Sequence, residues 1–252
     1  MKKTVTLHFY NEEYLLPWWL NYHKKHFDHG ILINYNSTDR SVEICKELAP
    51  EWQVVNSRNA DFGVESLDKE LTDIESGIDG WRMSLSVSEF LVGNYNNLDD
   101  IPSKQLIVPT ITFMDFNPTG SLDKSKELWE QLHEGVTPSR DLNFRRARSC
   151  HNYAVKYPFG GRHYDTGTAN VNDLAVFHFG NCISSPEMLA RRLQIQHRIP
   201  QHDKERKWGH NHYSLNNRDS ELTEQSLNEY HRGCLAKIDD ITETINKYTT
   251  KE

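Results

Sequence analysis

The stretch TVTLHFYNEEYLLPWWLNYHKKHFDHGILINYNSTD, residues 4–39, contains two short β-type runs with a helical segment between them. Residues 4–10 alternate and are rich in β-formers, and residues 30–35 form a second, apolar run. Asn11 is placed to cap a helix between these runs. Four side chains recur there at helical spacing: Leu16, Trp19, Leu20 and His23. This order of strand, helix and strand is typical of a mostly parallel sheet covered on both faces.

The alternation of strands and helices continues downstream. Helices are predicted through residues 42–48 and 64–78, the second with an apolar stripe facing the body and Asp68, Glu70, Asp73 and Glu75 around the rest of its surface. Further strands are predicted at residues 52–56, 81–92, 105–113 and 175–179, a helix from Ser185, and one or two amphipathic helices after Ser220. The sequence therefore predicts an α/β fold with a Rossmann-like, mostly parallel central sheet, in residues 1–215, and a helical extension, 216–252, packed on the same domain.

Composition narrows the classes of partner. The 252 residues favour one core. The 36 acidic and 29 basic residues give a net charge of −7, the wrong sign for a protein that coats nucleic acid. The four cysteines form no C-x-x-C pair, so neither a zinc knuckle nor a disulfide framework is indicated. The first residues are too polar for a signal peptide or membrane span. We expect a soluble, cytoplasmic protein.

Serines alternate with apolar residues over 81–92. Ser84, Ser86 and Ser88 fall between Met83, Leu85 and Val87, and a period of two sends the three hydroxyls to one face of a strand. Ligands of parallel sheets bind at the carboxyl ends of the strands. We therefore expect these serines to line a cleft at the edge of the sheet.

Several short motifs resemble family 2-like glycosyltransferases in both order and spacing. They are Asn11-Glu12-Glu13-Tyr14-Leu15-Leu16-Pro17-Trp18-Trp19, Asn34-Tyr35-Asn36-Ser37-Thr38-Asp39, Trp81 with Ser86-Val87-Ser88-Glu89-Phe90-Leu91, Gly161-Arg162-His163, His178-Phe179 and the run from Ser185 to Pro200. The resemblance spans roughly residues 4–212. It implies a nucleotide-diphospho-sugar transferase (GT-A) fold that uses a UDP- or GDP-sugar as donor.

The resemblance also implies a nucleotide site. Asn11, Glu13, Asn34 and Asp39 match the positions that hold the base and ribose, although Asn34 stands where the family often has Asp. The alternative is structural, with Asn11 as a helix cap and Asp39 as a turn-former, and both readings can hold together.

At Ser86-Val87-Ser88, relatives of this kind carry Asp-x-Asp, which holds Mn²⁺ or Mg²⁺ against the diphosphate. Two hydroxyls do not replace two carboxylates, and Glu89 reaches the site only if the strand bends or ends there. Three readings stay open: a metal held by other groups such as His178, a diphosphate held by arginines, or a binding protein without catalysis. The candidate arginines are Arg145, Arg146, Arg148, Arg162, Arg191, Arg192 and Arg198.

An inverting transferase needs a carboxylate to accept the proton of the acceptor hydroxyl. Asp115, Asp173 and Glu187 are the candidates, and Asp115 is preferred because it follows a strand. The predicted activity is transfer of a sugar to a hydroxyl of a glycan or glycoconjugate, with a non-catalytic nucleotide-sugar or glycan-binding protein as the alternative. Trp18 and Trp19 are expected in the core. His202, His210 and His212 are expected in a polar loop rather than at a metal.

Overall fold

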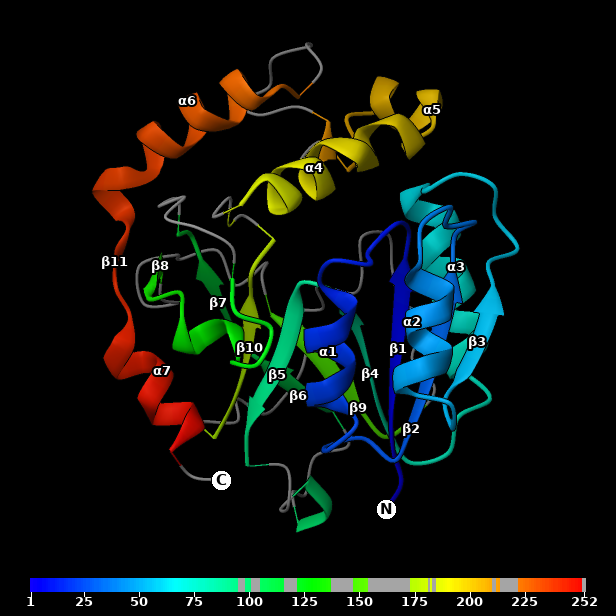
Figure 1. The fold of residues 1–252 in the computed structure, drawn as a ribbon. Coiled ribbons are helices and arrows are strands. Elements are labelled where there is room, and N and C mark those ends of the chain that lie inside the picture. Colours follow the sequence, from blue (N-terminus) through cyan, green and yellow to red (C-terminus); the bar gives the residue numbers. More distant parts are fainter. Residues whose placement is uncertain are drawn as a thin grey trace.

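The computed structural model describes residues 1–94, 98–100, 105–115, 122–136, 147–153, 173–180, 182, 185–209, 212–213 and 222–250. Within these ranges the strands form two adjoining sheets (Figure 1). The first has the order β3 (Gln53–Asn56), β2 (His29–Asn34), β1 (Lys3–Phe9), β4 (Trp81–Ser86), β9 (Arg148–His151) and β6 (Gln105–Val108). The second has the order β11 (Asp239–Asp240), β8 (Glu134–Val136), β7 (Thr110–Phe113), β10 (Leu174–His178) and β5 (Glu89–Gly93).

The first sheet confirms the predicted α/β class. β3, β2, β1 and β4 are all parallel, and β9 and β6 add an antiparallel pair at one side. α1 (Leu16–His23) and α2 (Ser41–Leu48) contribute to the large core on one face, and α3 (Val64–Glu75) packs on the other. β1 lies centrally, with His8 level with Ile33 of β2 and Ser86 of β4.

Two predicted strands are each divided between the sheets. The run 81–92 is β4 and β5, separated by a turn at Val87 and Ser88, and the run 105–113 is β6 and β7, separated by Pro109. Proline has no N–H to continue a ladder. At the other break, the Glu89 carboxylate accepts a hydrogen bond from the Ser86 N–H at 2.8 Å, a contact within the turn. The prediction of continuous strands was wrong at both places.

Helix α1 is fastened to β5 through two aromatic side chains. The Trp19 indole donates to the Glu89 carbonyl at 2.9 Å. His23 Nδ1 lies 2.9 Å from the Trp19 carbonyl, and His23 Nε2 accepts from the Leu91 N–H at 3.3 Å. Burial lowers the pKa of His23 to about 3, so the ring is the neutral Nδ1–H tautomer. Trp18 and Trp19 are both buried, which confirms the prediction that they belong to the core.

The face of the first sheet under α3 is partly polar. Glu70 accepts hydrogen bonds from the Tyr35 hydroxyl, at 3.0 Å, and the Ser57 hydroxyl, at 2.8 Å, and lies 3.6 Å from His8 Nε2. Glu75 accepts from the Thr6 hydroxyl at 2.9 Å. Asp68, Glu70 and Glu75 are buried, so the prediction that they surround an exposed surface was wrong. The strands beneath α3 supply the polar partners that periodicity alone does not show.

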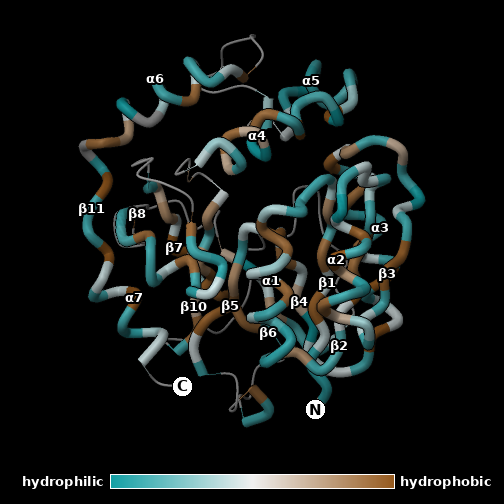
Figure 2. Tube along the Cα trace, viewed as in Figure 1, coloured by the Kyte–Doolittle hydropathy of each residue, from teal (hydrophilic) through white to brown (hydrophobic). Residues whose placement is uncertain are grey.

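The last part of the chain crosses the carboxyl ends of the first sheet and returns to the second. α4 (Pro186–Gln194), η4 (Ile195–Arg198), α5 (Gln201–Glu205) and α6 (Glu224–Cys234) lie along the top in Figure 1. After η6 (Leu235–Lys237), β11 pairs with β8, and α7 (Thr242–Thr249) buries Ile245 and Tyr248 in the main core. α5 is hydrophilic along its whole length (Figure 2). Two short 3-10 helices, η1 (Leu98–Asp100) and η2 (Leu128–Glu130), complete the described elements.

Amphipathic helices in the C-terminal region were predicted, and α6 and α7 confirm them. The boundary at residue 215 stays a prediction. Residues 201–205 form α5, so the loop predicted around His202 was wrong. Among the described residues, no helix has the length and apolar character needed to cross a bilayer.

Candidate functional site at the carboxyl edge

The candidate site lies where the chain changes direction across the first sheet. From β1 the chain proceeds outward to β2 and β3 and then returns to β4 on the other side of β1. The loops after β1 and β4 therefore diverge at the carboxyl edge, which is the position where α/β sheets bind ligands. α4 lies over this edge (Figure 1).

The loops after β1 and β2 are joined by side chains. The Asn11 carboxamide oxygen accepts from the Thr38 N–H at 2.7 Å, and the Asn11 N–H donates to the Ser37 hydroxyl at 3.1 Å. The Glu13 N–H donates to an Asp39 carboxylate oxygen at 3.0 Å. Asn11 has a φ of 50°, a left-handed conformation that Asn tolerates.

Asn11 does not cap α1, because the N-cap residue is Leu15 and no side chain satisfies the helix start. Asp39 does accept from the Ser41 N–H at 3.0 Å, as a turn-former would. Asn34 is buried, donates to the Asn56 side chain at 3.1 Å and accepts from the Ser37 N–H at 2.8 Å. The four predicted nucleotide-binding residues are thus brought together. Their side chains mostly form hydrogen bonds that stabilise the loops after β1 and β2.

The three serines do not share one environment. Ser84 is buried, and its hydroxyl has no hydrogen-bond partner in the described part of the chain. Ser86 is partly exposed at the end of β4, while Ser88 is buried in the turn, with its hydroxyl 3.4 Å from that of Ser86. The expectation that all three line a cleft was wrong, because Ser84 is buried within β4 and Ser88 is buried in the turn that follows Ser86. Ser86 alone of the three is open to solvent.

Glu89 lies beside these serines and is paired with an arginine. Arg148 Nε donates to the Glu89 carboxylate at 3.0 Å, and Nη2 contacts its second oxygen. Burial alone raises the pKa of Glu89, but Arg148 and His178 lower it to about 2. Arg148 therefore neutralises Glu89, so its predicted role as a guanidinium fork to a diphosphate was wrong.

His178 ends β10 directly opposite Glu89 in the sheet register. Gly180 packs against its ring: a Cβ on Gly180 would overlap the imidazole and lie 3.2 Å from the Ser88 hydroxyl. Gly180 was not among the predicted site residues, although a glycine two residues after His178 indicates a close approach.

The donor set does not fit Mn²⁺ or Mg²⁺. These cations prefer anionic oxygens, whereas Ser86 and Ser88 are neutral and the Glu89 carboxylate is already bound by Arg148. Among the residues that the structure describes, no group of three or more His, Cys, Asp or Glu side chains is arranged to hold a metal ion.

α4 supplies arginines above the edge and is attached to the first loop by polar contacts. Arg191 Nε donates to the Glu12 carboxylate at 2.5 Å, and the Gln194 side chain donates to the Asn11 carbonyl at 2.7 Å. Burial and the neighbouring Arg191 lower the pKa of Arg192 to about 10. Burial, outweighing Arg191, raises the pKa of Glu12 to about 7. Glu12 lay within a quoted motif but was not singled out as a site residue.

Arg198 follows in η4. Its Nη2 donates to the carbonyls of Tyr35, at 3.2 Å, and Ala60, at 2.5 Å. Its guanidinium lies 4.5 Å from the centre of the Tyr10 ring. Arg198 thus links η4 to the loops after β1 and β2, and Tyr10 is a further residue that the sequence analysis missed.

The three carboxylates predicted as candidates for the general base lie at different places in the fold. Asp115 follows β7 at the same edge as His178, because β7 and β10 are parallel. Asp173 precedes β10 and so lies at the opposite end of that strand, which contradicts its candidacy. Glu187 is exposed in the first turn of α4, where Ser185 caps the helix by accepting from the Met188 N–H at 3.3 Å.

Some predicted residues lie outside the described part of the chain, namely Arg145, Arg146, Arg162 and His210.

Comparisons with known proteins give distant likenesses only. No protein-family model matches the chain, and no curated protein matches it in sequence. Among solved structures, TarS 1-349 from S. aureus is 14% identical with a TM-score of 0.45, covering 79% of this chain and 65% of TarS 1-349. Glucosyl-3-phosphoglycerate synthase from Mycobacterium tuberculosis, solved with Mn²⁺, UDP and glucosyl-3-phosphoglycerate, is 14% identical over 44% of each chain, with a TM-score of 0.31.

A third structure, HddC from Yersinia pseudotuberculosis, is 12% identical and has a TM-score of 0.38, covering 76% of this chain and 97% of HddC. This chain covers slightly less than two thirds of the length of TarS 1-349.

Proposed function

We propose that this protein is a GT-A-like glycosyltransferase that transfers a sugar from a nucleotide-sugar donor to a hydroxyl of a glycan or glycoconjugate. One observation carries the proposal: the joined loops after β1 and β2 and the Ser86–Glu89 turn meet at the switch point of a parallel sheet, beneath α4. The base and ribose of a UDP- or GDP-sugar would lie on the loops, and the diphosphate would lie between Ser86 and α4.

Transfer in this site would proceed without a resident metal. The acceptor oxygen attacks the anomeric carbon, the bond from that carbon to the diphosphate oxygen breaks, and the nucleoside diphosphate leaves with the electron pair. Asp115 is the proposed acceptor of the hydroxyl proton if configuration is inverted. The charge on the leaving group would be offset by Arg191 and Arg192, since guanidinium groups bind phosphate oxygens well.

Use of Arg191 in this way requires its release from Glu12. The ion pair at 2.5 Å holds the guanidinium while the donor is absent, and a diphosphate carries more negative charge than one carboxylate. Donor binding is thus proposed to exchange the Glu12 carboxylate for the diphosphate.

The second candidate is a nucleotide-sugar or glycan-binding protein without catalysis. Its support is the Glu89–Arg148 pair, which leaves the turn after β4 without the free carboxylates that metal-dependent transferases use. The two candidates differ in one measurable respect, because an enzyme hydrolyses its donor slowly even without acceptor.

The test is a thermal-shift series with UDP- and GDP-sugars, each with and without Mn²⁺. A donor at about 100 times its Kd stabilises the folded state by about 2.7 kcal/mol. We expect stabilisation without metal that is reduced in Arg191→Ala and unchanged in Lys46→Ala, an exposed position on α2. No stabilisation by any donor would exclude the transferase and a nucleotide-sugar-binding protein. Stabilisation by a donor that releases no free sugar on separate incubation with the protein would favour the binding protein.

Ser86→Asp is the companion variant, because Ser86 is the partly exposed serine at the end of β4. We expect it to weaken donor binding without metal, since it adds a negative charge next to the diphosphate. Binding that instead becomes dependent on Mn²⁺ would show that a single carboxylate at this place restores a metal site.

A further inference from the structure

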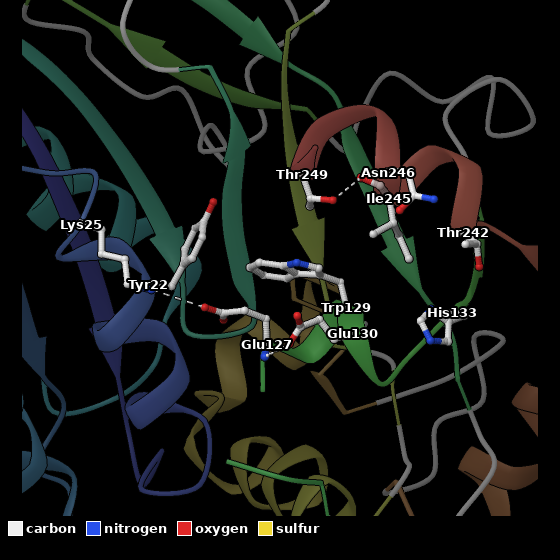
Figure 3. A pocket seen from close by; sticks show the side chains of 10 residues that line it. All are labelled: Tyr22, Lys25, Glu127, Trp129, Glu130, His133, Thr242, Ile245, Asn246 and Thr249. Carbon is white, nitrogen blue, oxygen red and sulfur yellow. Dashed lines mark hydrogen bonds and ion pairs between the residues drawn. The ribbon is translucent and has the colours of Figure 1, made fainter. Parts of the chain in front are cut away.

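A pocket separate from the carboxyl edge lies between α1, η2 and α7. It has a volume of about 390 Å³, within the range of roughly 300–1,000 Å³ that is usual for small-molecule sites. Trp129 lies in it, with Lys25, Tyr22 and Glu127 toward one side and Ile245, Asn246 and Thr249 of α7 toward another (Figure 3).

The pocket is on the face of the second sheet away from the proposed donor site. The Trp129 ring packs against Phe177 of β10, with 5.6 Å between ring centres, and against Phe90 of β5, at 5.8 Å. Phe177 and His178 are consecutive in a strand, so their side chains point to opposite faces. The pocket and His178 therefore lie on opposite faces of this sheet.

Among the described residues, none accepts a hydrogen bond from the Trp129 indole N–H. The indoles of Trp18, Trp19 and Trp81 each donate a hydrogen bond, to Lys126, Glu89 and Asp99 respectively. Trp129 is only 7% exposed, and no described residue accepts from its N–H. The N–H is not among the fully buried polar atoms of the described residues, so it stays accessible to a ligand. Figure 3 shows the indole nitrogen on the side of the ring toward α7, where Asn246 and Thr249 lie.

The charges around the pocket do not favour an anionic ligand. Lys25 and Glu127 form an ion pair at 3.7 Å, and the Glu130 carboxylate accepts from the Glu127 N–H at 2.8 Å. No excess of positive charge is present to bind a phosphate. The small accessible parts of Tyr22 and Trp129, with amide, hydroxyl and carboxylate groups around them, provide a limited apolar contact for a sugar ring together with donors and acceptors for its hydroxyls.

We propose that this pocket binds one neutral pyranose unit of a saccharide, with the Trp129 N–H and Asn246 as hydrogen-bonding groups. The inference depends on the pocket's own walls and does not rest on the proposed function. If the protein transfers sugars, the pocket would hold a distant unit of the glycan acceptor and tether it to the protein.

The test follows the Trp129 indole resonance in ¹H–¹⁵N spectra of the full chain, without nucleotide. The probes are the methyl glycosides of glucose, galactose and N-acetylglucosamine, with inorganic phosphate for comparison. We expect at least one glycoside to shift this resonance saturably, and Asn246→Ala to weaken its binding roughly three- to tenfold, the factor supplied by one neutral hydrogen bond.

Glu243→Gln is the matched control, because Glu243 is exposed on the same helix and does not line the pocket. Its affinity should equal that of the unmodified protein. The proposal is overturned if no glycoside shifts the resonance, if phosphate binds at least as well, or if Asn246→Ala binds unchanged. None of these results depends on donor binding, so the two proposals fail separately.

Discussion

At the scale of single residues, the buried ion pair of Glu89 and Arg148 is the most consequential contact of the candidate site. Arg148→Met leaves an uncompensated carboxylate in the interior, and removing one partner of such a pair costs about 3–5 kcal/mol. We expect a fall of this size in the unfolding free energy, measured by urea denaturation at neutral pH.

The double variant Glu89→Gln/Arg148→Met is the control, because it leaves no buried charge. It should be more stable than Arg148→Met alone, and equal stability of the two would contradict the assignment. The pKa of Glu89 is lowered from 4.5 to about 2 in the folded state. Its contribution is therefore present above pH 4.5 and is lost as the pH falls toward 2, a loss that Glu89→Gln removes.

Gly180 allows the close approach of the His178 ring. In Gly180→Ala the added Cβ overlaps the imidazole, so the ring must rotate. We expect the His178 imidazole resonances to move, with a change in Tm of only a few degrees because the overlap is with the far end of a side chain and not with backbone. Unmoved His178 resonances would show that the backbone at Gly180 adjusts instead.

At the scale of elements, the contacts of α4 with the described body include several hydrogen bonds and the ion pair of Arg191 with Glu12. Besides Arg191 and Gln194, the Ser185 hydroxyl donates to the Tyr14 hydroxyl at 3.2 Å, and Met188 is the buried residue of the helix. We expect Arg191→Ala to raise amide hydrogen exchange across residues 185–194. Exchange in β1 should be unchanged, and Glu187→Gln, on the exposed side, should leave α4 as protected as before.

The Glu12 carboxyl couples this attachment to pH. Burial raises its pKa from 4.5 to about 7, so the folded state holds a proton that the unfolded state releases between these values. Stability therefore falls as the pH rises through this window. We expect Glu12→Gln to flatten the fall between pH 5 and pH 8 in urea denaturation. Identical pH dependence in both proteins would show that Arg191 compensates the buried charge fully.

At the scale of the whole molecule, one core joins the beginning and the end of the chain. The same cluster of buried side chains includes Val5 of β1 and Ile245 and Tyr248 of α7. Ile245→Ala should therefore lower the global unfolding free energy by about 2–5 kcal/mol. Tryptophan fluorescence and far-ultraviolet circular dichroism should still report one coincident transition. Two separate transitions would mean that α7 unfolds independently, and Glu243→Gln, at an exposed position of the same helix, is the control.

Local patterns in the sequence were sufficient to predict the series of strands and helices from β1 to α3. They also predicted the C-terminal amphipathic helices. Periodicity and turn residues act within a few positions, and those elements follow them. The predicted nucleotide-binding residues Asn11, Glu13, Asn34 and Asp39 are found together because they lie at or after the carboxyl ends of β1 and β2, which are adjacent and parallel.

The partners of charged side chains came from the packing instead. Arg148 is 59 residues from Glu89, and Arg191 is 179 residues from Glu12. Glu70 and Glu75 are buried because strands distant in sequence supply polar groups beneath α3. The way the two sheets adjoin decides whether a charged side chain is exposed to solvent or paired with an opposite charge. For Glu89, the pairing with Arg148 depends on the break in the strand after Ser86, and the alternation of serines does not predict that break.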